Sequence, residues 1–155
     1  MRLVVPYTKR LPEVVAALPD AEWIDVAVDD FAYWRLLYRL WSNHEAFTIV
    51  EHDIVPAPDL LAEIRDCPEE WCAAGYAFED FGLIYGLGCV KFAASLTERV
   101  PAALGAVAAM ETTDHPARHW CSLDDRLSGV LRRAGVVQHH HGEVRHLLPV
   151  RSHDC

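Results

Sequence analysis

No stretch of this sequence is long and apolar enough to cross a membrane. Hydrophobic residues make up 52% of the chain, but Asp, Arg, Glu or His interrupts them every few residues. A membrane-spanning helix needs about 18 or more consecutive apolar residues. The opening stretch, residues 1–6, has too short an apolar run for a signal peptide and no cleavage site behind it. We therefore expect a soluble, cytoplasmic protein with no membrane span.

Basic residues are scarce as well. The 14 Lys and Arg residues are outnumbered by 23 Asp and Glu residues, which gives a formal net charge of −9. A nucleic-acid backbone is held by clustered Lys and Arg, so this composition argues against a nucleic-acid partner. An enzyme of this charge that handles anionic substrates needs a bound cation or a local basic pocket.

Paired cysteines are missing. The five cysteines are odd in number and include no C-x-x-C pair: Cys67, Cys72, Cys89, Cys121 and Cys155. The spacing therefore indicates neither a disulfide framework nor a zinc knuckle.

What the sequence does contain is an alternation of short apolar runs with helical patterns. Strands are predicted over 3–5, 23–28 and 47–50, and helices over 11–18, over 31–41 and from residue 60. This rhythm favours an α/β fold with a mostly parallel central sheet flanked by helices. A chain of 155 residues fits one domain, and we find no internal repeat or linker, so we expect a single domain over 1–155.

The pattern of predicted elements changes in the second half of the sequence. We predict a strand over 71–76, a glycine-punctuated stretch over 82–88, one helix over about 98–110, and a helix that opens near Ser122 and is closed by Gly135.

Glu51 and Asp53 are the most informative pair of acids. They follow an apolar strand of a predicted parallel sheet, at the edge where α/β proteins bind ligands. Carboxylates in this arrangement suit a hard divalent cation such as Mn²⁺ or Mg²⁺, which would neutralise a diphosphate. The alternative is a polar turn.

Asp124 and Asp125 lie near a predicted helix start. Acids there stabilise the helix dipole, and Asp125 has the capping-box position relative to Ser122. The functional interpretation makes one of them a general base for an acceptor hydroxyl.

Four histidines, His139, His140, His141 and His146, follow a predicted strand. Alternate members of an extended run point the same way, so His139 and His141 form a natural pair of metal ligands. A solvated polar loop is the alternative for each residue alone.

The segment Pro6, Tyr7, Lys9 and Arg10 surrounds the end of the first strand. An aromatic ring there could stack on a nucleobase and the cations could meet phosphate. Asp29 and His52, which end the second and third strands, belong to the same predicted nucleotide-binding group.

Taken in chain order, these pieces resemble the GT-A glycosyltransferases, most nearly the β-1,4-galactosyltransferase-like inverting group, in a shortened form. The similar segments are the Pro-aromatic-basic segment at 5–10, the acid-x-acid segment at 51–56, the glycine-rich segment at 86–90, the helix start at 120–125 and a histidine after that helix, at His139. Glu51 stands where the group has Asp, and Leu123 where it has the Glu of its acceptor-binding pair.

The resemblance implies a minimal GT-A-like, Rossmann-like domain that moves a sugar from a UDP- or GDP-sugar to an acceptor hydroxyl, with inversion. It implies a metal held by Glu51, Asp53, His139 and His141, and an acceptor side at Gly86, Gly88 and Trp120. The acceptor could be a glycan, a protein or a small molecule, and the chain could form a homo-oligomer.

Two other functions fit the sequence. One is a histidine-rich zinc-binding structural or interaction module, with His139, His141, His146 and Cys121 as ligands, which would unfold on chelation. The other is a degenerate sugar-nucleotide binder that lacks acceptor chemistry, as Leu123 suggests.

Overall fold

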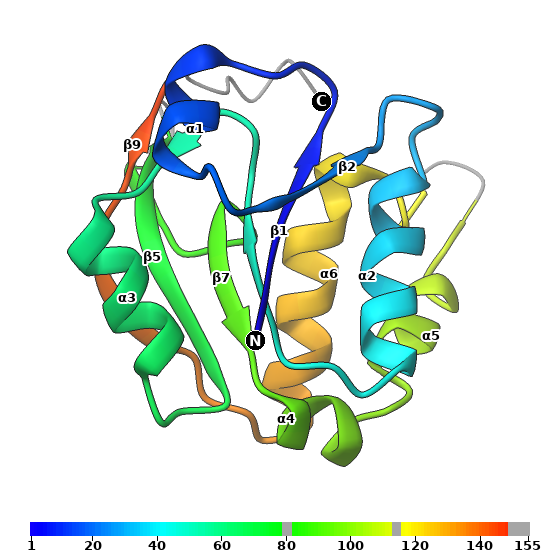
Figure 1. The fold of residues 1–155 in the computed structure, drawn as a ribbon. Coiled ribbons are helices and arrows are strands. Elements are labelled where there is room, and N and C mark those ends of the chain that lie inside the picture. The colour runs from blue at the N-terminus through cyan, green and yellow to red at the C-terminus, as the bar shows by residue number, and fades with distance from the viewer. Residues whose placement is uncertain (79–81, 113–115, 149–155) are drawn as a thin grey trace.

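A computed structural model describes residues 1–78, 82–112 and 116–148 (Figure 1). The strands are β1 (Arg2–Tyr7), β2 (Glu22–Asp25), β3 (Phe47–Val50), β4 (Ile54–Val55), β5 (Trp71–Phe78), β6 (Gly82–Ile84), β7 (Cys89–Phe92), β8 (His139–Glu143) and β9 (Arg145–His146). The helices are α1 (Pro12–Ala17), α2 (Ala32–Ser42), α3 (Pro58–Asp66), α4 (Ala94–Arg99), α5 (Ala103–Ala108) and α6 (Trp120–Arg133). Within the described ranges, no helix has the length and apolar character needed to cross a bilayer.

The central sheet has the order β2-β1-β3-β7-β5-β6, with β8 also paired to β5. β1 runs parallel to β2 and β3, and β5 runs parallel to β8, whereas β7 is antiparallel to both β3 and β5, and β6 is antiparallel to β5. All of these strands except β7 and β6 therefore point the same way, which confirms the predicted α/β fold with a mostly parallel sheet.

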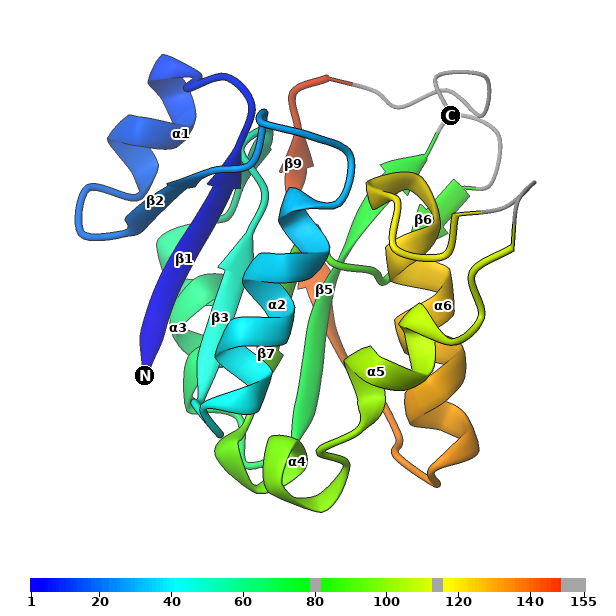
Figure 2. The same cartoon turned by 90° about the vertical axis from the view of Figure 1, so that its right-hand side faces the viewer.

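Helices cover both faces of this sheet (Figures 1 and 2). Strand alternation divides the core, because successive side chains point to opposite faces. Val4 belongs to the cluster that packs under α2, α5 and α6. Its neighbour Val5 belongs to the cluster that includes Val14 of α1 and Ile64 of α3. The result is a three-layer arrangement with a buried sheet.

The predicted single helix over 98–110 is wrong. The structure has α4 and α5 instead, with Pro101 between them. Proline lacks a backbone N–H and disfavours helical geometry in the residue before it. Val100 accordingly leaves the helix, with φ −125° and ψ 58°.

The start of α6 also differs from the prediction. Its first residue is Trp120, and His119 caps it by accepting a hydrogen bond from the Cys121 N–H at Nδ1, 3.2 Å away. The first turn contains no acid, so the helix-dipole explanation of Asp124 and Asp125 and the capping-box explanation of Asp125 are wrong. The predicted stop is right: Gly135 follows the helix with φ +74°, a left-handed conformation that glycine adopts readily.

The histidine run does not follow a strand; it forms one. Residues 139–141 open β8 and pair with the first half of β5. The segment before it, residues 136–138, is not part of a strand.

Candidate active site

A small cavity lies at the carboxyl ends of β1, β2 and β3. β1 lies between the other two strands, so the direction of winding reverses there. Open α/β sheets bind ligands at such a reversal. The cavity has a volume of about 180 Å³. It is lined by Pro6, Thr8, Val26, Asp29, Asp30, Tyr33, Glu51, His52, Asp53 and Trp120.

Three residues that we expected beside a nucleotide, Pro6, Asp29 and His52, line this cavity. Asp29 Oδ2 is 2.6 Å from Arg35 Nη2, and this ion pair lowers the pKa of Asp29. His52 Nε2 is 3.4 Å from Thr8 Oγ1, and burial lowers the pKa of His52. A neutral imidazole at the cavity wall can either donate or accept a hydrogen bond.

The other three expected residues lie outside the cavity. The Tyr7 ring contacts Trp23 edge-on at a centroid distance of 5.9 Å, and the Arg10 guanidinium lies 4.7 Å from the Tyr7 centroid. Lys9 is exposed in the loop after β1. Strand alternation explains this correction, because Tyr7 points to the face opposite that of Pro6. Tyr7, Lys9 and Arg10 are therefore not placed against a nucleotide in this cavity.

Asp53 is held next to His146. The antiparallel pair β4–β9 sets Ile54 opposite His146, and the Leu147 N–H donates to the Asp53 carbonyl over 2.8 Å. His146 Nε2 is then 3.0 Å from Asp53 Oδ2, and the Asp53 residue is only 8% exposed. Burial opposes charge on His146, but the hydrogen bond and the negative charge of Asp53, with smaller contributions from the Ala77 carbonyl and Glu51, together outweigh it and raise the pKa of His146.

Glu51 is shared by the small cavity and a larger one. Burial raises the pKa of Glu51 to about 8, with further increases from the charges of Asp53 and Asp124. The Tyr33 hydroxyl, on α2, is buried without a hydrogen-bond partner among the described residues. Burial, followed by the charges of Glu51 and Asp124, raises the pKa of Tyr33. These groups form an acidic, oxygen-rich junction.

The predicted joint metal set of Glu51, Asp53, His139 and His141 is not assembled. His139 pairs in register with Cys72, at the start of β5, whereas His146 Nδ1 is 3.5 Å from the Ala77 carbonyl near its end. Five residues of strand span about 16 Å. His139 and His141 are thus too far along β5 to share a cation with the acids after β3, and His146 is the late histidine beside them.

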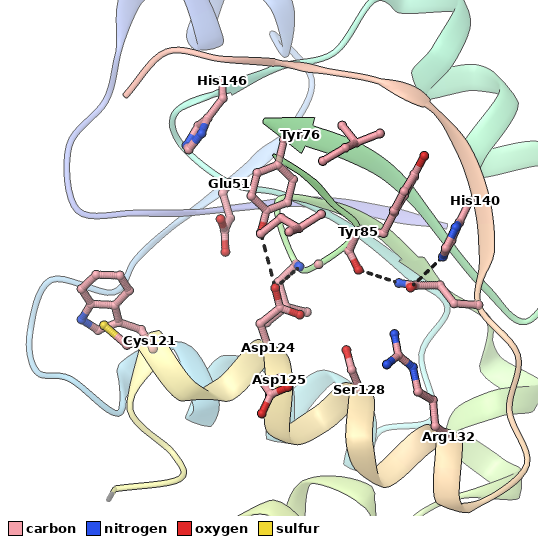
Figure 3. A pocket seen from close by; sticks show the side chains of 16 residues that line it. Glu51, Tyr76, Tyr85, Cys121, Asp124, Asp125, Ser128, Arg132, His140 and His146 are labelled. Atoms are coloured by element: carbon pink, nitrogen blue, oxygen red, sulfur yellow. Dashed lines mark hydrogen bonds between the residues drawn. The ribbon is translucent and has the colours of Figure 1, made fainter. Parts of the chain in front are cut away.

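The larger cavity, of about 740 Å³, lies between α6 and the segment 83–87 (Figure 3). Asp124, Asp125, Ser128 and Arg132 line it from α6, at spacings that place them along one face of the helix. The His140 ring lies on the opposite wall, stacked on Tyr85 at a centroid distance of 3.8 Å.

Asp124 has buried hydrogen-bond partners. Its Oδ2 accepts from the Leu87 N–H at 3.1 Å and from the Tyr76 hydroxyl at 3.4 Å. Burial raises the pKa of Asp124 despite these two bonds. Asp125, by contrast, is exposed at the cavity wall.

The two glycines expected on the acceptor side have a steric role. A Cβ atom on Gly86 would lie 1.7 Å from Asp124 Oδ2, and one on Gly88 would lie 2.7 Å from Tyr76 Cε1. Gly86 lines the large cavity, whereas Gly88 does not. Trp120 lines both cavities with 45% of its surface exposed.

Sequence reasoning did not single out Tyr33 or Tyr76. Both lie in apolar sequence patterns that predict core residues. In the structure both are indeed only 7% exposed. The one available signal is the choice of Tyr where Phe would fill the core equally well, because a buried hydroxyl needs a polar partner.

Solved structures similar to this chain include the following two. One, from Desulfovibrio desulfuricans G20, is assigned as a nucleotide-diphospho-sugar transferase; the similarity covers 92% of this chain and 59% of that one, with a TM-score of 0.45 and 12% identity. The other, from Bacillus anthracis, is assigned as a glucose-1-phosphate thymidylyltransferase in complex with sucrose; 90% of this chain and 66% of that one are covered, with a TM-score of 0.47 and 11% identity. This chain therefore spans less than two thirds of each.

No protein-family model matches the chain, and no curated protein matches it.

Proposed function

We propose that the chain is a metal-dependent glycosyltransferase that moves a sugar from a nucleoside-diphosphate sugar to an acceptor hydroxyl. The observation that carries the proposal is the meeting of the two cavities. They share Glu51 and Trp120 beyond the carboxyl ends of parallel strands, and Asp124 lies in the wall of the larger one. Such a site has separate cavities for a donor and an acceptor, with carboxylic acids between them.

The small cavity suits the nucleoside of the donor. Asp29 and Asp30 can accept hydrogen bonds from ribose hydroxyls or base N–H groups, and Trp120 offers a ring for stacking. The diphosphate would then lie at the junction near Glu51 and Asp53.

The junction fits a hard divalent cation. Its donors are carboxylate oxygens, and Mn²⁺ or Mg²⁺ bound to phosphates needs few protein ligands. Glu51 and Asp53 would hold the ion, with His146 adjacent to Asp53. When bound, the cation supplies positive charge that stabilises the leaving diphosphate.

Transfer is a single displacement at the anomeric carbon. The acceptor oxygen forms a bond to that carbon while its bond to the diphosphate oxygen breaks and the diphosphate leaves with the electron pair. Asp124 takes the acceptor proton. Oδ2 is occupied by the Leu87 N–H and Tyr76, so Oδ1 is the oxygen that receives it. Attack from the side opposite the leaving group inverts the configuration.

The first test is thermal unfolding of the metal-stripped protein with Mn²⁺, alone and with UDP, GDP, UDP-sugars or GDP-sugars. A ligand at a hundred times its Kd should stabilise the folded state by about 2.7 kcal/mol. Asp53→Asn, which keeps the side-chain shape and removes the charge, should abolish the Mn²⁺-dependent part of the shift. Asp20→Asn, in an exposed turn, is the control and should keep it.

Transfer itself is tested by mass spectrometry of mixed acceptors with the donor that shifts the melt, and NMR of the product reports its configuration. A Mn²⁺-dependent nucleotide shift without any transferred sugar would replace the transferase with a sugar-nucleotide binder. If no nucleotide shifts the melt with Mn²⁺ present, the donor site proposed here is wrong.

A further inference from the structure

A second cluster of metal-ligating side chains lies at the other end of β5. It comprises Cys67, just after α3, Cys72 of β5, and His139 and His141 of β8. One donor atom from each of the four residues lies within 4.8 Å of every other. Among the described residues this is the one group of three or more such donors at that spacing.

The backbone brings these residues together. β8 runs parallel to β5 with Cys72 opposite His139, so alternation turns His139 and His141 to the face where α3 packs. Their ring centroids are 4.7 Å apart. His140 points to the opposite face and stacks on Tyr85. The alternation that predicted His139 and His141 as a pair is thus observed, with cysteines rather than acids as the neighbours.

His141 carries the clearest sign of a missing ligand. Its side chain is 4% exposed, and its Nδ1 is 2.8 Å from Glu63 Oε1. Its Nε2 is buried with no hydrogen-bond partner among the described residues. An imidazole that donates to a carboxylate from Nδ1 has a lone pair on Nε2, which is the arrangement of a metal-bound histidine. A cation bound at the cluster would accept the Nε2 lone pair. This would remove the free-energy cost of burying a polar atom without a partner.

The thiols complete the set. Cys67 and Cys72 are 9% and 0% exposed, and Cys67 Sγ is 3.1 Å from His139 Nδ1. Lys91, itself 4% exposed, donates to the Cys67 carbonyl, which places a positive charge near sulfurs that must be deprotonated to bind metal.

We propose that Cys67, Cys72, His139 and His141 form a Zn²⁺ site, with Glu63 as the carboxylate that orients His141. Two thiolates and two imidazoles are the ligands of tetrahedral structural zinc, at about 2.3 Å for sulfur and about 2.0–2.1 Å for nitrogen. Ligands at those distances lie about 3.3–3.8 Å apart in a tetrahedron, so small side-chain rotations would close the observed cluster. Four protein ligands leave no open position, so the ion ties α3, β5 and β8 together rather than taking part in a reaction.

The test is the zinc content of the untagged protein purified without added metal. We expect one zinc per chain, lost in Cys72→Ser and in His141→Ala. Cys89→Ser and His140→Ala are matched controls, because Cys89 is a buried free thiol outside the cluster and His140 lies on the other face of β8. Glu63→Gln should keep the stoichiometry and weaken zinc binding by about 10–100-fold.

A second measurement uses wild-type protein alone, in case the variants fail to fold. Replacement of zinc by Co²⁺ should give the intense visible absorption of a tetrahedral ion with thiolate-to-cobalt charge transfer. A weak octahedral spectrum, zinc retained in both ligand variants, or protein that binds no zinc after reduction would overturn the proposal. An isolated Cys67–Cys72 disulfide in freshly reduced and re-purified protein would overturn it as well. Because Mn²⁺-dependent nucleotide binding is measured separately with Asp53→Asn, each proposal can fail without the other.

Discussion

At the scale of single residues, Asp124 and Asp125 differ in what surrounds their carboxylates. Both line the large cavity, but Asp124 is tied to the Leu87 N–H and to Tyr76, whereas Asp125 is exposed. A base that is positioned by two hydrogen bonds and has a raised pKa is suited to accept a proton from a hydroxyl.

Asp124→Asn should therefore lower kcat by about 10²–10⁴-fold, the usual contribution of a general base. The nucleotide-dependent shift of the melt should remain, because the amide fills the same space. Asp125→Asn should cause a smaller loss. Equal losses of kcat in the two variants would remove the distinction between the two aspartates.

Glu51 makes folding stability depend on pH. Its pKa is about 8 in the folded protein and 4.5 ordinarily, so the folded state binds a proton that the unfolded state has lost between those values. The free energy of unfolding should therefore fall as pH rises from about 4.5 to about 8. The contribution is at most about 5 kcal/mol, since each pH unit is worth about 1.4 kcal/mol.

Glu51→Gln removes this proton uptake. In EDTA, the variant should gain stability over the wild type as pH rises from 5 to 8, measured by urea unfolding. Glu13→Gln, on the exposed side of α1, is the control and should follow the wild type. If the difference between Glu51→Gln and wild type stays constant over this pH range, the raised pKa of Glu51 is wrong.

At the scale of elements, the site depends on how closely the segment before β7 approaches α6. Gly86 allows that approach, because any side chain there would meet Asp124 Oδ2. The backbone N–H of Leu87 can reach the carboxylate only at this distance.

Gly86→Ala should displace Asp124, lower kcat by at least about tenfold and destabilise the fold by about 1–3 kcal/mol, as overpacking does. Gly105→Ala is the matched control. Its added Cβ meets nothing within 4 Å, and alanine in a helix is favoured by about 0.5–1 kcal/mol, so this variant should be more stable and as active as wild type. An active Gly86→Ala enzyme would show that Asp124 need not stay where it is.

Element boundaries were predictable where local chemistry alone decides them. The buried strand Phe47–Val50 and the stop at Gly135 follow from an apolar run and from a left-handed residue. Pro101 could have been recognised in the sequence as a helix breaker, but the helical spacing on both sides of it led to the prediction of one continuous helix. That the histidine run forms a strand could not be predicted, because this depends on its pairing with β5, which is far away in the sequence.

The candidate site, like the element boundaries, could be predicted only in part. Glu51 and Asp53 could be placed at a ligand-binding edge, since parallel strands end together. That Asp53 meets His146, and that His139 meets Cys67, could not be predicted, because these contacts arise from the β4–β9 pair and from the register of β8 on β5.

At the scale of the whole molecule, Trp120 is, with Glu51, one of the two residues that line both cavities. Its position at the first turn of α6 lets one ring form part of the wall of each. A side chain that is 45% exposed contributes little to the core, so its role can be separated from stability.

Trp120→Ala should raise KM for both the donor and the acceptor about tenfold or more, since stacking on an aromatic ring is worth about 1–3 kcal/mol. The melting temperature without ligand should change little. Tyr38→Ala is the control, because Tyr38 is equally exposed but lies on α2 outside both cavities. An effect on one substrate alone would mean that the two cavities act independently.

The side chains of the histidine run in β8 alternate between the two faces of the strand. Odd-numbered members face the cysteines and the even-numbered member faces the large cavity, because the strand repeats every two residues. A shift of β8 by one residue along β5 would exchange the two sets and turn His140 toward the thiols. A shift by two residues would restore the original faces. The separation of the cluster from the cavity thus depends on the register of β8 on β5, which decides both which histidines meet the cysteines and which one meets the cavity.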